Sequence, residues 1–190
     1  MTSIKDLRVA IVGGGVCGLT CAIALAKKGI RAHIYEAAAE FGEIGAAIGI
    51  GPTAVRVLHD LDLLKDVLTK ADASDPNAEV SWFQFRSGLD DHEIIYEYAL
   101  KPGEQSIGMH RAAFLDALVD HVDPQLTHFN KRCINVTPST TDSSRLTLYF
   151  ADGNNDEADI VLGADGIKSA VRAAVAGADL GKTLKFSNNE

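Results

Sequence analysis

A glycine-rich motif close to residue 13 has the residue types that bind phosphate. Gly13, Gly15 and Gly18 form the pattern G-x-G-x-x-G directly after an apolar run at residues 9–12. In this pattern the first glycine permits a tight turn, the second lets the backbone approach a pyrophosphate, and the third allows a helix to pack closely on a strand. The N–H groups at the start of that helix then point towards the phosphates. The motif therefore predicts a binding site for the pyrophosphate of a dinucleotide.

Glu36 ends the next apolar run, at the spacing from the glycines at which an acid accepts hydrogen bonds from an adenosine ribose. A strand, a glycine turn, a helix and an acid in this order indicate a dinucleotide site much more strongly than the glycines alone. The alternative is a glycine-rich turn that binds no dinucleotide. The motif fits NAD and FAD equally, because both contain an ADP half.

A second candidate site follows the apolar run 158–162, where Gly163-Ala164-Asp165-Gly166 leads into a helical pattern. This turn brings a carboxylate and a helix amino terminus to the same place. Asp165 therefore either approaches a cofactor or caps its own helix, a position that aspartate favours. Arg111, in the first turn of another predicted helix, is opposed by the helix dipole, so a nearby cofactor phosphate would explain it. An ion pair with a local acid is the alternative.

The elements that must position these residues begin with a β-α-β unit. Residues 7–12 are apolar on both faces, as in a central strand of a parallel sheet. Apolar residues then recur at helical spacing over 16–26, and a second strand follows at 32–36. Residues 42–51 match neither a strand nor a helix. Further helices are predicted for residues 52–59 and 61–69.

The spacing of apolar residues changes to two between residues 79 and 98, which predicts a β-hairpin with one solvated face. The polar segment 72–78 before it is a candidate domain boundary. A helix is predicted from Arg111 to just before Pro124. The sequence then predicts short strands near 126–136, 145–151 and 157–162 and a helix from about residue 168.

The composition limits the partners and the compartment of the protein. A formal charge of −8 and a pI of about 5.2 disfavour nucleic acid or an anionic membrane surface as a partner. No apolar stretch reaches the roughly 18–20 residues that span a bilayer, and residues 1–6 leave no room for a leader. We therefore expect a soluble, cytoplasmic protein. The three cysteines are expected to be small buried thiols, and neither they nor the six scattered histidines predict a metal site.

The G-x-G-x-x-G motif with Glu36, followed by A-D-G-x-x-S-x-x-R at residues 164–172, resembles the motif pair of the flavin-dependent aromatic hydroxylases, the group A flavoprotein monooxygenases. Residues 45–58 are similar to the G-A-G-I-x-I-G-P-N-A run of salicylate hydroxylases, with Ala47 in place of a glycine and Thr53 in place of an asparagine. The H-R-x-x-L helix start of the family has its counterpart at residues 110–115. The resemblance covers essentially the whole chain.

The resemblance implies an α/β fold, a Rossmann-like FAD-binding domain of the glutathione-reductase type with a three-stranded β-meander and the start of an antiparallel substrate-domain sheet. Residues 1–78 and 99–190 would form a discontinuous FAD-binding domain, incomplete at its C-terminus, and residues 79–98 the first hairpin of the substrate domain. Members of the family are longer, so the sequence is interpreted as the N-terminal part of such a protein.

The resemblance also implies where FAD would bind. The glycine motif would hold the pyrophosphate, Glu36 the adenosine ribose, and residues 47–48 the flavin ring. Asp165 and Gly166 would approach the phosphate and ribityl region and help to admit NADH or NADPH. The complete set of implied FAD contacts is Gly13, Gly15, Val16, Cys17, Gly18, Glu36, Ala37, Ala47, Ile48, Arg111, Ile134, Asp165 and Gly166. No residue is assigned as a catalytic base.

The activity that the resemblance implies is a monooxygenase of aromatic degradation. It would use FAD, NADH or NADPH, and O₂ to hydroxylate a small phenolic acid such as salicylate, which would lose its carboxyl group and become catechol. Three alternatives stay open. The substrate could be another hydroxylated aromatic such as 3-hydroxybenzoate, 6-hydroxynicotinate or a polycyclic phenol; the chain could be a non-catalytic flavin-binding module; or it could be an NAD-dependent dehydrogenase, which the hairpin and the strands of 126–162 suit less well.

Overall fold

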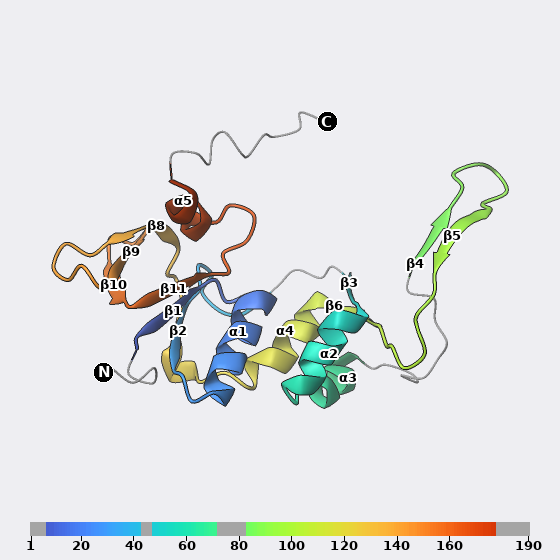
Figure 1. The fold of residues 1–190 in the computed structure, drawn as a ribbon, viewed down its shortest axis with the longest axis horizontal. Coiled ribbons are helices and arrows are strands. Elements are labelled where there is room, and N and C mark those ends of the chain that lie inside the picture. The colour runs from blue at the N-terminus through green and yellow to red at the C-terminus, as the bar shows by residue number, and fades with distance from the viewer. Residues whose placement is uncertain (1–6, 43–46, 72–82, 178–190) are drawn as a thin grey trace. The chain divides into compact units, whose positions relative to one another are not determined.

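The computed structural model of the protein describes residues 7–42, 47–71 and 83–177. The chain forms two compact units, one made of Met1–Gly42 with His121–Glu190 and the other of Glu43–Asp120. Figure 1 shows the elements of both, coloured in chain order. The predicted boundary segment 72–78 lies outside the described residues, and the assignment of 79–98 to a separate substrate domain stays a prediction.

A four-stranded parallel sheet forms the centre of the first unit. Its strands are β1 (Val9–Val12), β2 (Ala32–Tyr35), β7 (Thr127–His128) and β11 (Ile160–Gly163). They stand in the order β11-β1-β2-β7, and every neighbouring pair is parallel. All four residues of β1 are buried, as its apolar sequence predicts for a strand covered on both faces. The predicted α/β class is confirmed.

Two layers cover this sheet. Helix α1 (Val16–Lys27) packs on β1 and β2. On the opposite face, Ala10, Val12 and Tyr35 share a core with Leu148 and Phe150 of an antiparallel meander. The meander consists of β8 (Cys133–Pro138), β9 (Leu146–Phe150) and β10 (Asn155–Ala158); the unit also contains the 3-10 helix η2 (Pro124–Leu126) and helix α5 (Ala170–Ala176). Figure 1 shows the meander and α1 on either side of the parallel strands.

Two predicted strands are each divided in the structure. The run 126–136 breaks at Asn130, whose φ of 57° is left-handed, so that its first part joins the parallel sheet as β7 and its second becomes β8. The run 157–162 breaks at Asp159, whose carboxylate accepts the Arg8 N–H at 2.7 Å between β10 and β11. The prediction of one strand was wrong in both places, because a change of sheet leaves the apolar pattern almost uninterrupted.

The second unit combines a pair of short strands with three helices. The strands β3 (Ala47–Ile50) and β6 (Ile107–His110) are antiparallel. The prediction that residues 42–51 contain no strand is therefore wrong for 47–50, because the partner strand is far away in the sequence and leaves no local signal. The helices are α2 (Pro52–Asp60), α3 (Leu64–Ala71) and α4 (Arg111–Val119).

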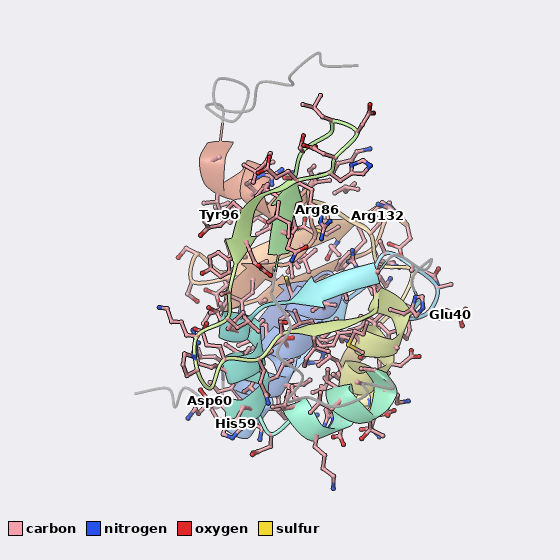
Figure 2. All side chains as sticks on the ribbon, turned by 90° about the vertical axis from the view of Figure 1, so that its right-hand side faces the viewer. Glu40, His59, Asp60, Arg86, Tyr96 and Arg132 are labelled. Atoms are coloured by element: carbon pink, nitrogen blue, oxygen red, sulfur yellow. The ribbon has the colours of Figure 1, made fainter. Side chains whose placement is uncertain are left out.

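The predicted hairpin forms from β4 (Phe83–Arg86) and β5 (Ile94–Tyr98). Cross-strand pairs of Phe83 with Tyr98 and of Phe85 with Tyr96 place four aromatic rings on one face, and these rings are 48–55% exposed. Figure 2 labels Arg86 and Tyr96 on these strands. The sequence predicts that one face of the hairpin is solvated. Among the described residues, the side chains on both faces of the hairpin are largely exposed.

A polar cluster joins the parallel sheet to the meander in the first unit. The Tyr35 hydroxyl donates to Asp156 Oδ2 at 2.5 Å, and Arg8 Nη2 lies 2.5 Å from Oδ1 of the same carboxylate. Burial alone raises the pKa of Asp156, but the hydrogen bonds from Tyr35 and the Glu157 N–H, together with the charge of Arg8, hold that pKa below its ordinary value. Burial and the contact with Asp156 raise the pKa of Tyr35.

We expect this cluster to make the stability of the fold depend on pH in the acid range. Because the pKa of Asp156 is lower in the folded than in the unfolded chain, its stabilisation is complete at neutral pH and is lost as the pH falls below about 4. In urea unfolding at pH 7, the free energy of unfolding of Asp156→Asn should be about 1 kcal/mol lower than that of wild type. The difference is small because solvent screens these partly exposed charges. The difference should shrink towards pH 3, and a difference that does not change with pH would contradict the assignment.

Candidate cofactor site

Gly13 and Gly18 shape the turn between β1 and α1. Gly13 has a left-handed φ of 103°, and a Cβ there would overlap the carbonyl group of Ala164. A Cβ at Gly18 would overlap the carbonyl oxygen of Gly13. Both positions therefore require glycine, as the motif predicts, and Gly13 also brings the turn against the segment that leads to Asp165.

Gly15 and the first turn of α1 leave room for an anion. Gly15 is the N-cap of α1, and no side chain caps the helix or places a carboxylate in its first turn. Among the described residues, a Cβ at Gly15 would meet no atom within 4 Å, so the backbone here is open to a ligand. The N–H groups at a helix start carry partial positive charge and bind phosphate oxygens. This end of α1 therefore fits a pyrophosphate.

Glu36 lies directly against the glycine turn. Its Oε2 accepts the Gly14 N–H at 2.6 Å, and its Oε1 accepts the Ala38 N–H at 2.8 Å. A carboxylate oxygen has about two lone pairs, so each oxygen can accept one further hydrogen bond, for instance from a ribose hydroxyl. Gly14 is absent from the predicted site residues. The signal that could have found it is its place between two glycines that the motif already requires.

Asp165 binds the amino terminus of helix α5, whose N-cap residue is Ser169. Its Oδ1 accepts the Ser169 hydroxyl at 2.5 Å, and its Oδ2 accepts the Ala170 N–H at 2.6 Å. The capping alternative is thus the arrangement that the structure shows. Gly166, the next residue, is exposed with a φ of 74°. Contact of Asp165 or Gly166 with a cofactor stays a prediction, and in this arrangement it would use the remaining lone pairs of the carboxylate.

The three cysteines differ in exposure. Cys17 is the second residue of α1 and is exposed, so the expectation of a buried thiol is wrong for it; the open start of the helix leaves its side chain uncovered. Cys21 and Cys133 are half-buried, and burial raises the pKa of both thiols. A raised pKa lowers the thiolate fraction and hence the reactivity of these two side chains.

The other predicted contacts are divided between the two units. In the first unit, Val16 and Ala37 are half-buried and the Ile134 side chain is 58% exposed on β8. In the second unit, Ala47 of β3 pairs with His110 of β6, the residue that precedes Arg111. The structure therefore places Ala47 and Arg111 in the same unit, where Ala47 pairs with the residue that precedes Arg111.

A comparison with models of protein families shows to which family the chain belongs. The model described as FAD binding domain matches residues 6–184, nearly the whole chain. The chain belongs to this family of FAD-binding domains. Contact of the individual residues above with FAD stays a prediction.

Known relatives of this FAD-binding domain are flavoprotein monooxygenases. A salicylate hydroxylase from Pseudomonas putida is 38% identical over 170 residues, which are 89% of this chain and 38% of that protein. A 6-methylsalicylate 1-monooxygenase from Aspergillus terreus is 37% identical over 185 residues, covering 93% of this chain and 41% of its own. The structure of a 2-methyl-3-hydroxypyridine-5-carboxylic acid oxygenase matches 89% of this chain and 42% of its own at 30% identity, with a TM-score of 0.68. The chain thus spans about 40% of the length of the curated relatives it matches.

The first unit of the FAD-binding domain fits the ADP half of the cofactor. The open backbone at Gly15 and the uncapped start of α1 suit two phosphates, and the Glu36 carboxylate beside them suits a ribose.

In the part of the chain that the structure describes, no helix has the length and apolar character needed to cross a membrane.

Proposed function

We propose that the chain is the FAD-binding part of a flavin-dependent monooxygenase that hydroxylates a phenolic aromatic acid of the salicylate type. The observation that carries the proposal is the 2.6 Å hydrogen bond from the Gly14 N–H to Glu36, because it sets an acid for the ribose beside an open helix start for the phosphates. The substrate class is supported by the relatives, whose names include salicylate, a methylsalicylate and a hydroxypyridine carboxylic acid.

In this proposal the residues of the chain bind and orient the cofactor. The N–H groups that follow Gly15 hold the pyrophosphate, and Glu36 accepts the ribose hydroxyls. Ala47 and Ile48 line the flavin ring, and Arg111 balances the negative charge of the phosphates. When bound, FAD would take two electrons from NADH or NADPH and deliver one oxygen atom of O₂ to the aromatic ring, the other leaving as water.

We propose further that residues 79–98 begin the substrate domain. Support comes from the four aromatic side chains on one face of the β4–β5 hairpin, which the described residues leave about half exposed. An apolar sheet face of this kind usually packs on something else, because burying it stabilises the protein by roughly 25 cal/mol per Å².

Titration of the purified chain with FAD tests the cofactor assignment. Binding should quench the flavin fluorescence and yield a yellow protein after removal of free FAD. If no FAD binds although the chain is folded by circular dichroism, the cofactor part of the proposal fails.

The rate of NADH or NADPH oxidation by the FAD-loaded full-length monooxygenase, of which we propose this chain to be the FAD-binding part, tests the substrate class. We expect salicylate to increase this rate more than 3-hydroxybenzoate or 6-hydroxynicotinate. A larger increase with one of the other acids would move the assignment to that compound. No increase with any of them would favour the alternative of a non-catalytic flavin-binding module.

Replacing Glu36 by alanine should raise the Kd for FAD by about 10- to 100-fold, because hydrogen bonds from the ribose to a charged acceptor are lost. Fluorescence titration of both proteins measures the change. Glu40→Ala is the matched control, since Glu40 is an exposed acid in the same loop, labelled in Figure 2, and its loss changes the net charge equally. If the two variants weaken FAD binding to the same extent, Glu36 has no specific role.

A further inference from the structure

The segment that follows Glu36 is held by the chain that follows β7. The Glu36 N–H donates to the His128 carbonyl at 2.8 Å, and the Glu36 carbonyl accepts the Lys131 N–H at 2.8 Å. The Asn130 N–H donates to the Ala38 carbonyl, also at 2.8 Å. These three backbone bonds fix the path of the chain on the C-terminal side of the predicted ribose-binding acid.

Two aromatic rings continue this attachment up to the glycine turn. Phe41 and Phe129 meet edge to face, with ring centroids 4.8 Å apart and planes at 76°. A Cβ placed on Gly14 would lie 2.7 Å from Cε1 of Phe41, so the ring edge rests on the Cα of this glycine. Both rings are half-buried. The Phe41 ring is thus supported by Phe129 and in turn presses on Gly14.

Gly14 is the residue whose N–H binds Glu36, so the ring and the carboxylate act on the same peptide. A Cβ on Gly14 would also lie 3.1 Å from Glu36 Oε2 and 3.2 Å from Glu36 Cβ. The carboxylate and the ring therefore enclose Gly14 together.

We propose that Phe41, backed by Phe129, is a positioning residue for the adenosine end of FAD. By holding Gly14 in place, it keeps the Gly14 N–H and the Glu36 carboxylate in the geometry that accepts the ribose. The inference rests on the proposed binding of FAD at this turn. It assigns to Phe41 a role that differs from general stabilisation of the fold, and the two roles make different predictions.

Phe41→Leu should raise the Kd for FAD about tenfold, because one charge-assisted hydrogen bond loses its fixed geometry. Phe41→Tyr keeps the ring and should retain the Kd within about twofold. The matched control is Phe150→Leu, which removes a 3% exposed ring from the core of the same unit. It should lower the melting temperature of the apo protein and leave the Kd for FAD unchanged, when binding is measured at a temperature at which all variants are folded.

A compensating pair of substitutions tests the contact between the Phe41 ring and Gly14. Gly14→Ala alone should weaken FAD binding about 100-fold, since its Cβ collides with the Phe41 ring and crowds Glu36. Phe41→Leu removes the colliding Cε1 atom, so the double variant should bind FAD more tightly than Gly14→Ala alone. Additive losses in the double variant would contradict the contact.

The possible outcomes separate this inference from the proposed function. Wild-type protein that binds no FAD overturns both. If wild-type protein binds FAD and Phe41→Leu binds it equally tightly, the positioning role alone is overturned and the cofactor assignment is left intact. If Phe41→Leu and Phe150→Leu weaken FAD binding in proportion to their loss of melting temperature, Phe41 acts through stability and the inference is wrong.

Discussion

Gly15→Val should strongly weaken FAD binding by a protein that remains fully folded. Gly15 has a φ of −75° and a ψ of −176°, which any residue adopts, and a Cβ there would meet no described atom within 4 Å. The valine side chain would instead fill the space through which the pyrophosphate must approach the backbone. We expect the Kd for FAD to rise by at least about 100-fold, and the melting temperature of the apo protein to stay within about 3 °C of wild type.

Flavin fluorescence titration and apo thermal unfolding together measure these two quantities. Gly88→Val is the matched control, because Gly88 is equally open and lies in the turn of the β4–β5 hairpin, outside the predicted cofactor contacts. It should change neither quantity. Retention of wild-type affinity in Gly15→Val would show that the phosphates do not approach the chain at this glycine, and the predicted site would have to be given up.

Gly18→Ala should have the largest effect on stability, a loss of about 3 kcal/mol in the free energy of unfolding of the apo protein. The added Cβ would overlap the Gly13 carbonyl oxygen and lie 3.0 Å from the Gly13 carbonyl carbon and 3.4 Å from Ile11 Cγ2. These atoms are backbone and core, so α1 would have to move away from β1. In an exposed helix the same change would stabilise the protein, because alanine loses less entropy than glycine on folding.

Urea unfolding of the apo protein measures this loss, with no cofactor present to affect the result. Gly42→Ala is the control, since a Cβ there would meet nothing within 4 Å among the described residues. It should leave the free energy of unfolding within about 0.5 kcal/mol of wild type. If Gly18→Ala has the same free energy of unfolding as wild type, α1 does not lie as close to β1 as the structure shows. The two glycines of one motif thus have separable roles, Gly15 for the ligand and Gly18 for the fold.

Local patterns predicted the parts of the fold that depend on neighbours in the sequence. The β-α-β unit, helices α2 and α3 and the β4–β5 hairpin follow from apolar spacing and from glycine or proline at their ends. The need for glycine at positions 13 and 18 follows in the same way, since the turn and the helix packing are made by residues a few positions apart.

The predictions that were wrong concern features that depend on residues distant in the sequence or on what covers a side chain. The β3 strand has no pattern of its own and exists because β6 pairs with it from far along the chain. The change of sheet at Asp159 depends on Arg8, which is distant in sequence and adjacent in space. Cys17 is exposed because the start of α1 is open, a fact that its apolar neighbours do not reveal.

The sequence by itself determined that the chain has a dinucleotide site and which turn would hold the pyrophosphate, because the glycine spacing and Glu36 encode a local geometry made by residues close together in the sequence. Only the tertiary structure decided how these residues meet. It directed the Asp165 carboxylate to the amino terminus of α5, set the Gly14 N–H on Glu36, and placed Phe41 and Phe129 beside them. The reason is that hydrogen bonds and ring contacts between distant segments depend on how the layers pack, and no spacing along the chain records that packing.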